Sequence, residues 1–170
     1  MADYVLERRL WLPRPRPEVF AFFADARRLA LFDSGGVRPP WPVRPSTALA
    51  TGATIDVTLS LAGLPLRWRQ FIREFDPPYR FVDAQVKGPF ARWEQRHVFR
   101  EGPEAEAGSG PLGTWVEDRL TYRMPLGVLG RLTHALITRR RIVHVLEQRE
   151  RRAREAMIAR PASAPACSSR

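Results

Sequence analysis

Residues 81–99 have the sequence FVDAQVKGPFARWEQRHVF, which predicts two antiparallel strands joined by a turn at Gly88-Pro89. After the turn, every second residue from Trp93 to Phe99 is an aromatic ring, an amide or an imidazole, whereas the alternate positions are mostly charged. Because successive side chains point to opposite faces of a strand, the first set is expected to face a core. This stretch therefore predicts a half-buried sheet whose inner face combines aromatic and polar groups.

The same alternation extends in both directions from this hairpin. Strands are expected over residues 4–12, 54–61, 64–75, 79–87, 90–100 and 113–124. A short helix is expected over residues 18–26, directly after Pro17, and a second one over residues 27–32. From Gly127 the apolar spacing becomes helical for about 30 residues, which predicts a long C-terminal helix.

The predicted order is one strand, two short helices, five strands and one long helix. An antiparallel sheet must cover its apolar face, and the C-terminal helix is the only predicted element long enough to do so. We therefore expect an α+β fold in which a curved six-stranded antiparallel sheet wraps around that helix and leaves a cavity for a small apolar ligand. The segment 33–51, rich in proline, is expected to be an irregular loop at the cavity mouth.

Length and composition favour a single core. A chain of 170 residues with 44% hydrophobic content predicts one ligand-binding domain over residues 1–158, followed by a disordered tail over 159–170. No apolar run reaches the roughly 20 residues needed to span a bilayer, and the charged N-terminus is unlike a signal peptide, so a cytoplasmic location is expected. The single cysteine, Cys167, excludes an internal disulfide. We expect no cofactor and no metal, because His97 has no histidine or cysteine at ligand spacing.

The net charge of +10 comes from 28 basic residues, of which Lys87 is the only lysine. The arginines are spread over nearly every segment without a nucleic-acid motif, so we do not expect nucleic acid as a partner. The densest group lies in the last helix, where Glu147 and Glu150 stand four residues before Arg151 and Arg154 and predict ion pairs along the helix. Peripheral membrane contact and the oligomeric state stay open.

The hairpin of residues 81–99, the stretch GTWVEDRLTYRMPLGVLG at residues 113–130 and the element order together resemble the START-like or SRPBCC superfamily, also called the helix-grip fold. The resemblance covers residue 3 to about residue 157. Similar proteins include polyketide cyclases, aromatases and Coq10-type quinone-binding proteins. The resemblance implies a ligand cavity between sheet and helix, but it does not imply one chemistry.

Hairpin register predicts a polar cluster on the inner face. It places Asp83 opposite Gln95 and Phe81 opposite His97, and it places Asp118 of the following strand opposite Gln95 or His97. Inward carboxylates need partners, and a carboxylate beside an imidazole favours the charged imidazole. The favoured interpretation is a network that fixes register or binds a ligand passively. The alternative is that His97 and Asp118 are catalytic as an acid and base pair.

The predicted ligand-binding residues share the inner face of the strands or the apolar stripe of the last helix. They are Leu66, Trp68, Gln70, Phe81, Asp83, Gln85, Trp93, Gln95, His97, Phe99, Asp118, Leu120, Tyr122, Leu136 and Arg140. Arg140 or its neighbour Arg139 lies on the apolar stripe, so one of them is hypothesised to enter the cavity and pair with an acidic group.

These patterns favour a binding or carrier protein for a small hydrophobic molecule such as a lipid, a quinone or a polyketide-like compound. The alternative in the same cavity is a cyclase, dehydratase or isomerase that uses His97 and Asp118. A further alternative is a module that contacts RNA or a membrane through the basic C-terminal helix.

Overall fold

The computed structural model describes residues 2–25, 37–38, 49–61, 64–105, 110–125, 130 and 137–159. All six predicted strands are present, with bounds within three residues of the predicted ones: β1 (Tyr4–Leu12), β3 (Thr54–Leu61), β4 (Leu64–Asp76), β5 (Arg80–Lys87), β6 (Arg92–Pro103) and β7 (Leu112–Arg123). A short strand that the sequence does not predict, β2 (Val37–Arg38), pairs with β3 within the segment expected to be an irregular loop.

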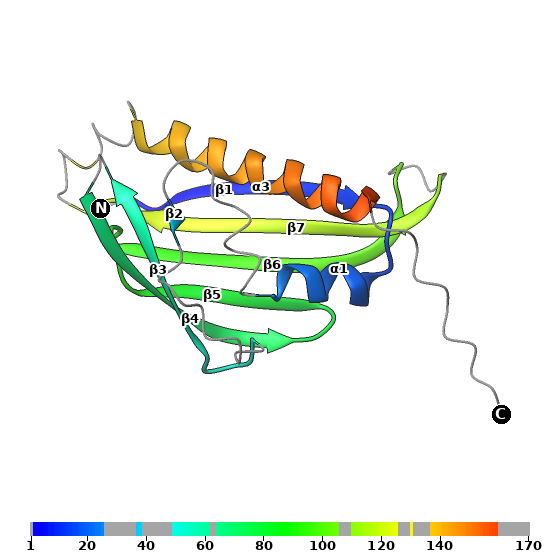
Figure 1. Cartoon of the computed structure of the whole chain (residues 1–170), viewed down its shortest axis with the longest axis horizontal. Helices are drawn as coiled ribbons and strands as arrows, with labels where there is room; N and C mark the ends of the chain where they lie inside the picture. Colours follow the sequence, from blue (N-terminus) through cyan, green and yellow to red (C-terminus); the bar gives the residue numbers. More distant parts are fainter. Residues whose placement is uncertain are drawn as a thin grey trace.

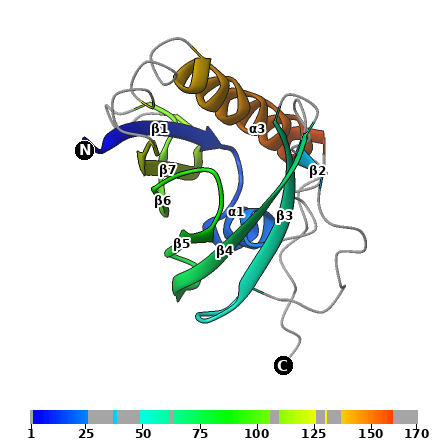
Figure 2. The same ribbon diagram turned by 90° about the vertical axis from the view of Figure 1, so that its left-hand side faces the viewer.

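The strands form one antiparallel sheet in the order β1-β7-β6-β5-β4-β3-β2 (Figure 1). The first strand of the chain pairs with the last one, so β1 and β7 lie side by side along their whole length. The register of β4 against β5 shifts after Arg69 and again after Ile72. Such bulges bend a strand and increase its twist. Figure 2 shows the result, since β4 and β3 curve away from β5 and form the second wall of a deep concave face.

The helix α1 (Arg16–Phe23) lies within this curve (Figure 2). The prediction of a short helix after the first strand is confirmed, although α1 begins two residues earlier and ends three residues earlier than expected. Pro17 stands in its first turn, where the missing N–H has no helical partner to lose. Its apolar residues are buried in the concave face: Val19, Phe20, Phe22 and Phe23.

The helix α3 (Arg139–Ala159) runs along β1 and β7 (Figure 1). Ile142, Leu146, Ala153 and Met157 are buried at helical spacing, which confirms the apolar stripe in this part of the helix. The predicted helix before residue 137, the second short helix, most of the 33–51 loop and the tail after residue 159 lie outside the described residues. No helix in the described part is long and apolar enough to cross a membrane.

The buried side chains form two separate hydrophobic clusters. The first, called here the α1 cluster, contains Leu10, Leu12, Val19, Phe20, Phe22, Phe23, Phe81, Phe99, Val116, Ala153 and Met157. The second, called the aromatic cluster, contains Trp93, Leu120, Tyr122, Ile142 and Leu146, with Tyr4, Leu6, Trp68, Phe90 and Met124 packed against it. The phenylalanines of α1 fill the first cluster, whereas no described helix other than α3 contributes to the second.

Candidate functional site

A row of polar side chains crosses the inner face of the sheet between the two clusters. We call it the polar belt and define it by its residues Arg8, Asp118, His97, Asp83 and Gln70. Its position follows from register, since Arg8 lies opposite Asp118 and Asp118 lies opposite His97. Along β6 the inner face accordingly passes from the aromatic cluster to His97 and then to the α1 cluster.

The predicted hairpin register is confirmed. Asp83 lies opposite Gln95, and Phe81 lies opposite His97. Of the two partners left open for Asp118, the structure selects His97. The four polar residues predicted to form one cluster therefore do lie together on the inner face.

His97 is at the centre of the belt and is only 1% exposed. Its Nδ1 lies 2.5 Å from Oδ1 of Asp118, and its Nε2 lies 3.3 Å from Oδ1 of Asp83. The amide of Gln70 donates to the other oxygen of Asp83 at 3.3 Å. The imidazole ring also lies against Phe81, with 4.3 Å between ring centroids. Both ring nitrogens face carboxylates, so this arrangement favours the doubly protonated imidazolium.

The charges in the belt reinforce each other. Burial by itself lowers the pKa of His97, but the charge of Asp118 and the hydrogen bonds to Asp118 and Asp83 outweigh it, so the pKa is raised above 6.5. Burial by itself raises the pKa of Asp118, but the charge and hydrogen bond of His97 outweigh it, so the pKa is lowered below 3.8. Near neutral pH the two side chains form a buried ion pair.

Arg8 ties the belt to α3. Its guanidinium donates two hydrogen bonds to the carboxylate of Glu150, at 2.8 and 3.1 Å, and lies 3.6 Å from Glu147. Among the described residues, the expected pairs from Glu147 to Arg151 and from Glu150 to Arg154 do not form, although an ion pair along the helix does form between Arg151 and Glu155 at 3.8 Å. A partly buried bidentate pair is stronger than an exposed pair along a helix, which explains why Glu150 turns toward β1.

The arginine of α3 that reaches the belt is Arg149. Its guanidinium lies 5.2 Å from the ring centre of Phe23, and its charge acts on both His97 and Asp118. Spacing had not singled out Arg149, although it stands three residues after Leu146 and thus lies close to the apolar stripe. Arg8 was missed as well, although it shares the parity of the inward residues of β1.

The prediction that Arg139 or Arg140 enters the cavity is wrong, because both are exposed. Their helical spacing from Leu136 and Val143 allowed an inward position. The buried stripe passes through Ile142 and Leu146, and at about 100° per residue Arg140 points away from Ile142. Arg139 lies on the side of the stripe, but it is the first residue of α3 and is exposed there.

The space between the belt and α3 is small. A hollow bordered by Asp118, Arg149 and Glu150 has a volume of about 10 Å³. This is close to the smallest volume that holds one water molecule. The belt is therefore packed, and a ligand of ordinary size needs another part of the interior.

The aromatic cluster has rings from four strands. Trp68 and Trp93 meet edge to face with 4.9 Å between centroids, and Phe90 lies 4.8 Å from Trp93. Tyr122 lies 5.9 Å from Phe90, and burial raises its pKa to about 12. A phenol with this pKa keeps its proton at neutral pH. The cluster is thus an apolar wall with neutral polar groups.

The other predicted ligand-binding residues fall into four groups. Leu120 lies in the aromatic cluster, whereas Phe81 and Phe99 pack in the α1 cluster. The amide of Gln85 donates to the backbone oxygen of Phe90 at 2.6 Å, so it closes the turn between β5 and β6. The side chain of Leu66 and all of Leu136 lie outside the described part of the structure.

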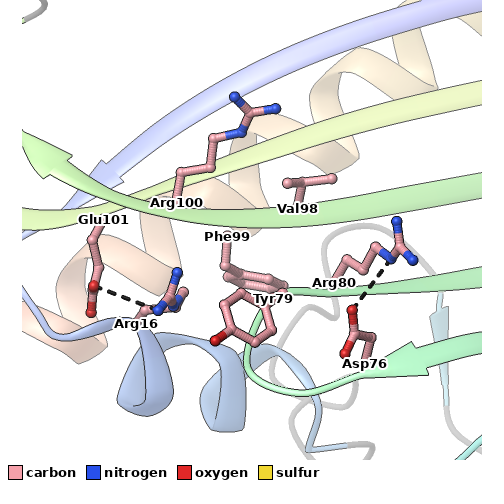
Figure 3. Close-up of a pocket in the computed structure, with 8 residues that line it drawn as sticks. All are labelled: Arg16, Asp76, Tyr79, Arg80, Val98, Phe99, Arg100 and Glu101. Carbon is pink, nitrogen blue, oxygen red and sulfur yellow. Dashed lines mark ion pairs between the residues drawn. The ribbon is translucent and has the colours of Figure 1, made fainter.

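A larger hollow of about 610 Å³ lies at the end of the sheet, beside the turn between β4 and β5 (Figure 3). Its arginines already have carboxylate neighbours: Arg16 lies 3.6 Å from Glu101, Arg80 lies 3.6 Å from Asp76, and Arg100 lies 3.3 Å from Glu117. It is open and its charges are balanced, so it is a weaker candidate than the interior.

The curved sheet with a helix along its concave side defines the helix-grip class of proteins, and solved structures agree. The chain is similar to TTHA0849 from Thermus thermophilus (TM-score 0.61, 22% identity, 91% of this chain and 99% of that one). It is also similar to a START superfamily protein from Mycobacterium smegmatis (TM-score 0.61, 12% identity, 89% of this chain and 98% of that one). A third similar structure is norcoclaurine synthase from Thalictrum flavum (TM-score 0.64, 10% identity, 94% of this chain and 88% of that one).

Residues 12–143 match the family model described as polyketide cyclase / dehydrase and lipid transport. The chain belongs to this family, which confirms the START-like resemblance and the helix-grip fold. No curated protein matches the sequence.

Proposed function

We propose that this protein binds a small, largely apolar molecule against the aromatic cluster, between the sheet and α3. The observation that carries the proposal is the division of the interior. The phenylalanines of α1 occupy one half, the polar belt is packed, and the other half presents rings of Trp68, Phe90, Trp93 and Tyr122. Ligand sites are typically apolar and aromatic, with a few polar groups that orient the ligand.

Relatives support a ligand of this kind. The family description names both polyketide cyclases and lipid transport. A norcoclaurine synthase of the same fold was solved in complex with dopamine and hydroxybenzaldehyde, which are small aromatic molecules. The fold thus accommodates such compounds in at least one distant member.

The belt geometry favours binding over acid and base catalysis. Both nitrogens of His97 face carboxylates, and the ring is buried. A general acid or base must reach the substrate with the atom that transfers the proton. His97 could do so only after losing one of its two partners, so its role here is to hold β5, β6 and β7 in register.

The first test asks for an apolar occupant. We expect native mass spectrometry of gently purified protein to show a bound apolar compound, and we expect stripped protein to bind 2-ethylnaphthalene. Trp93→Ala should weaken that binding about tenfold or more, because it removes part of the wall. Trp115→Ala, on the outer face, is the matched control. Absence of any occupant across expression hosts, together with no binding of the probe, would contradict the proposal.

A second candidate function, contact with an anionic membrane, is favoured by the charge of α3. α3 holds seven arginines and three glutamates, which gives this helix four net positive charges. Arg8 engages Glu147 and Glu150. Among the described residues, Arg139, Arg140, Arg141 and Arg154 are exposed without an ion pair.

Two exposed isoleucines favour a lipid surface over a phosphate polymer. Ile137, two residues before α3, and Ile158, in its last turn, are 55% and 67% exposed. A helix that combines cationic and apolar side chains on one face suits the headgroup region of a bilayer. A protein that carries an apolar ligand would also collect it there.

Vesicle sedimentation tests this candidate. The protein should bind phosphatidylserine-rich vesicles and not phosphatidylcholine vesicles. Replacing Arg139, Arg140 and Arg141 by glutamine should reduce binding at least about tenfold, since each arginine contributes about 1 kcal/mol at such a surface. The matched control replaces Arg67, Arg96 and Arg119, which are exposed on the outer face of the sheet. Equal losses in both variants, or binding of RNA but not vesicles, would refute membrane docking.

A further inference from the structure

We infer that the ligand carries a carbonyl oxygen that accepts a hydrogen bond from the indole N–H of Trp68 or Trp93. This inference rests on the proposed function and gives the ligand a chemical class, an apolar molecule with a ketone, quinone or ester group.

The indole nitrogens of Trp68 and Trp93 are buried, and neither has a hydrogen-bond partner among the described residues. Buried donors in proteins nearly always have a partner, so each exception calls for an explanation. Two other tryptophans follow the rule. Trp11 donates to the backbone oxygen of Gly102 at 3.2 Å, and Trp115 donates to that of Pro103 at 2.9 Å. Within the described part of the chain, the unpartnered indole donors are thus confined to the aromatic cluster.

The two indole rings cannot both serve as hydrogen-bond acceptors for each other's N–H group. They meet at 89° with 4.9 Å between centroids, so the edge of one ring points at the face of the other. A ring face accepts at most a weak hydrogen bond from an N–H. In this geometry only the ring that presents its edge can donate, and the second N–H is left without an acceptor. An acceptor from a ligand would satisfy at least that one.

The position of Trp68 is fixed by close packing. A Cβ added to Gly88 would overlap Oε1 of Gln85 and lie 2.5 Å from Cδ1 of Trp68, so only glycine fits beside this indole edge. Gln85 is itself held by the backbone of Phe90. The indole of Trp68, which comes from β4, is therefore held against the β5–β6 turn, and such fixed positioning is what a specific ligand site requires.

The surroundings favour a neutral acceptor. An indole N–H is an uncharged donor, and the high pKa of Tyr122 keeps that phenol neutral as well. The carboxylates of the belt are already engaged by His97 and Gln70. A carbonyl oxygen on a flat apolar skeleton matches both the donors and the aromatic walls.

A matched pair of probes tests the inference. 2-Acetylnaphthalene and 2-ethylnaphthalene have nearly the same size, and only the first carries a carbonyl oxygen. The stripped full-length protein, labelled with ¹⁵N, should bind the ketone about tenfold more tightly, as one hydrogen bond to a buried donor allows. The ketone should also move the indole N–H signals of Trp68 or Trp93 downfield, while those of Trp11 and Trp115 stay in place.

Trp68→Phe and Trp93→Phe keep the aromatic wall and remove one donor each. We expect the preference for the ketone to disappear in at least one of them while the binding of 2-ethylnaphthalene changes less than about threefold. Trp115→Phe should retain the preference. Equal binding of both probes by the unaltered protein would overturn the carbonyl inference and leave the proposed function standing. Binding of neither probe would overturn both.

Discussion

Replacing His97 by phenylalanine is expected to destabilise the protein by about 3–5 kcal/mol near neutral pH. The new ring would fill a similar volume and pack on Phe81 as the imidazole does. It would leave the buried carboxylates of Asp83 and Asp118 without their shared cation, and breaking a buried ion pair on one side has a cost of this size. Urea denaturation of both proteins measures the difference in the free energy of unfolding.

The pH dependence separates the charge of His97 from its shape. Because its pKa is raised, protonation of His97 stabilises the fold fully below pH 6.5, and this contribution is lost as the pH rises through the raised pKa. Because the pKa of Asp118 is lowered, its ionisation stabilises the fold above pH 3.8 and is lost as the pH falls through the lowered pKa. The difference in the free energy of unfolding between wild type and His97→Phe should therefore be largest between pH 3.8 and pH 6.5, and it should decline at lower and at higher pH.

Two further variants complete this experiment. His144→Phe removes an exposed histidine of α3 and should change stability by less than about 0.5 kcal/mol. Adding Asp118→Asn to His97→Phe removes one of the two orphaned charges and should recover part of the loss. A destabilisation that does not vary with pH would show that His97 acts through its shape alone.

Replacing Phe20 by alanine is expected to destabilise the protein by about 3–5 kcal/mol, the usual range for a buried phenylalanine. Phe20 is 4% exposed, and its ring lies 5.4 Å from Phe75, 5.9 Å from Phe81 and 5.2 Å from Phe99. The eight residues of α1 have no side-chain N-cap and are too few for a stable isolated helix, so packing alone holds them. Hydrogen exchange should become fast throughout α1.

Phe20→Leu is the matched variant, because it keeps most of the apolar volume. It should cost about 1 kcal/mol. Tyr79→Ala removes an aromatic ring that is half exposed and should cost less than Phe20→Ala. A loss below about 1 kcal/mol for Phe20→Ala would show that α1 does not fill this half of the interior.

The strands and the hairpin register were predictable from the sequence. Alternation in 81–99 places Asp83, Gln95 and His97 on one face, and a two-residue period leaves only two partners for Asp118. The bulges in β4 had no comparable signal, because an extra residue changes the face of those that follow without changing composition.

The helix contributions were less predictable. A stripe with a period of 3.6 residues admits neighbouring positions, so Arg140 and Arg149 both fitted it. The structure selects Arg149 because it stands three residues after Leu146, where α3 crosses the belt, whereas Arg140 lies in the first turn of α3 and is exposed. Likewise, spacing favours a pair between Glu150 and Arg154, but Arg8 comes from a strand 142 residues away in sequence and forms the stronger contact.

The sequence by itself determined the six long strands, α1 and the apolar stripe of α3, together with the inward face of each strand and the presence of an imidazole between carboxylates, because these depend on local periodicity and on pairing between neighbouring strands. Only the tertiary structure decided that α1 fills one half of the interior, that Arg8 takes the glutamates of α3, and that two indole donors are buried without partners among the described residues. Those outcomes depend on the rotation of helices and on contacts between distant segments, and periodicity does not fix either one.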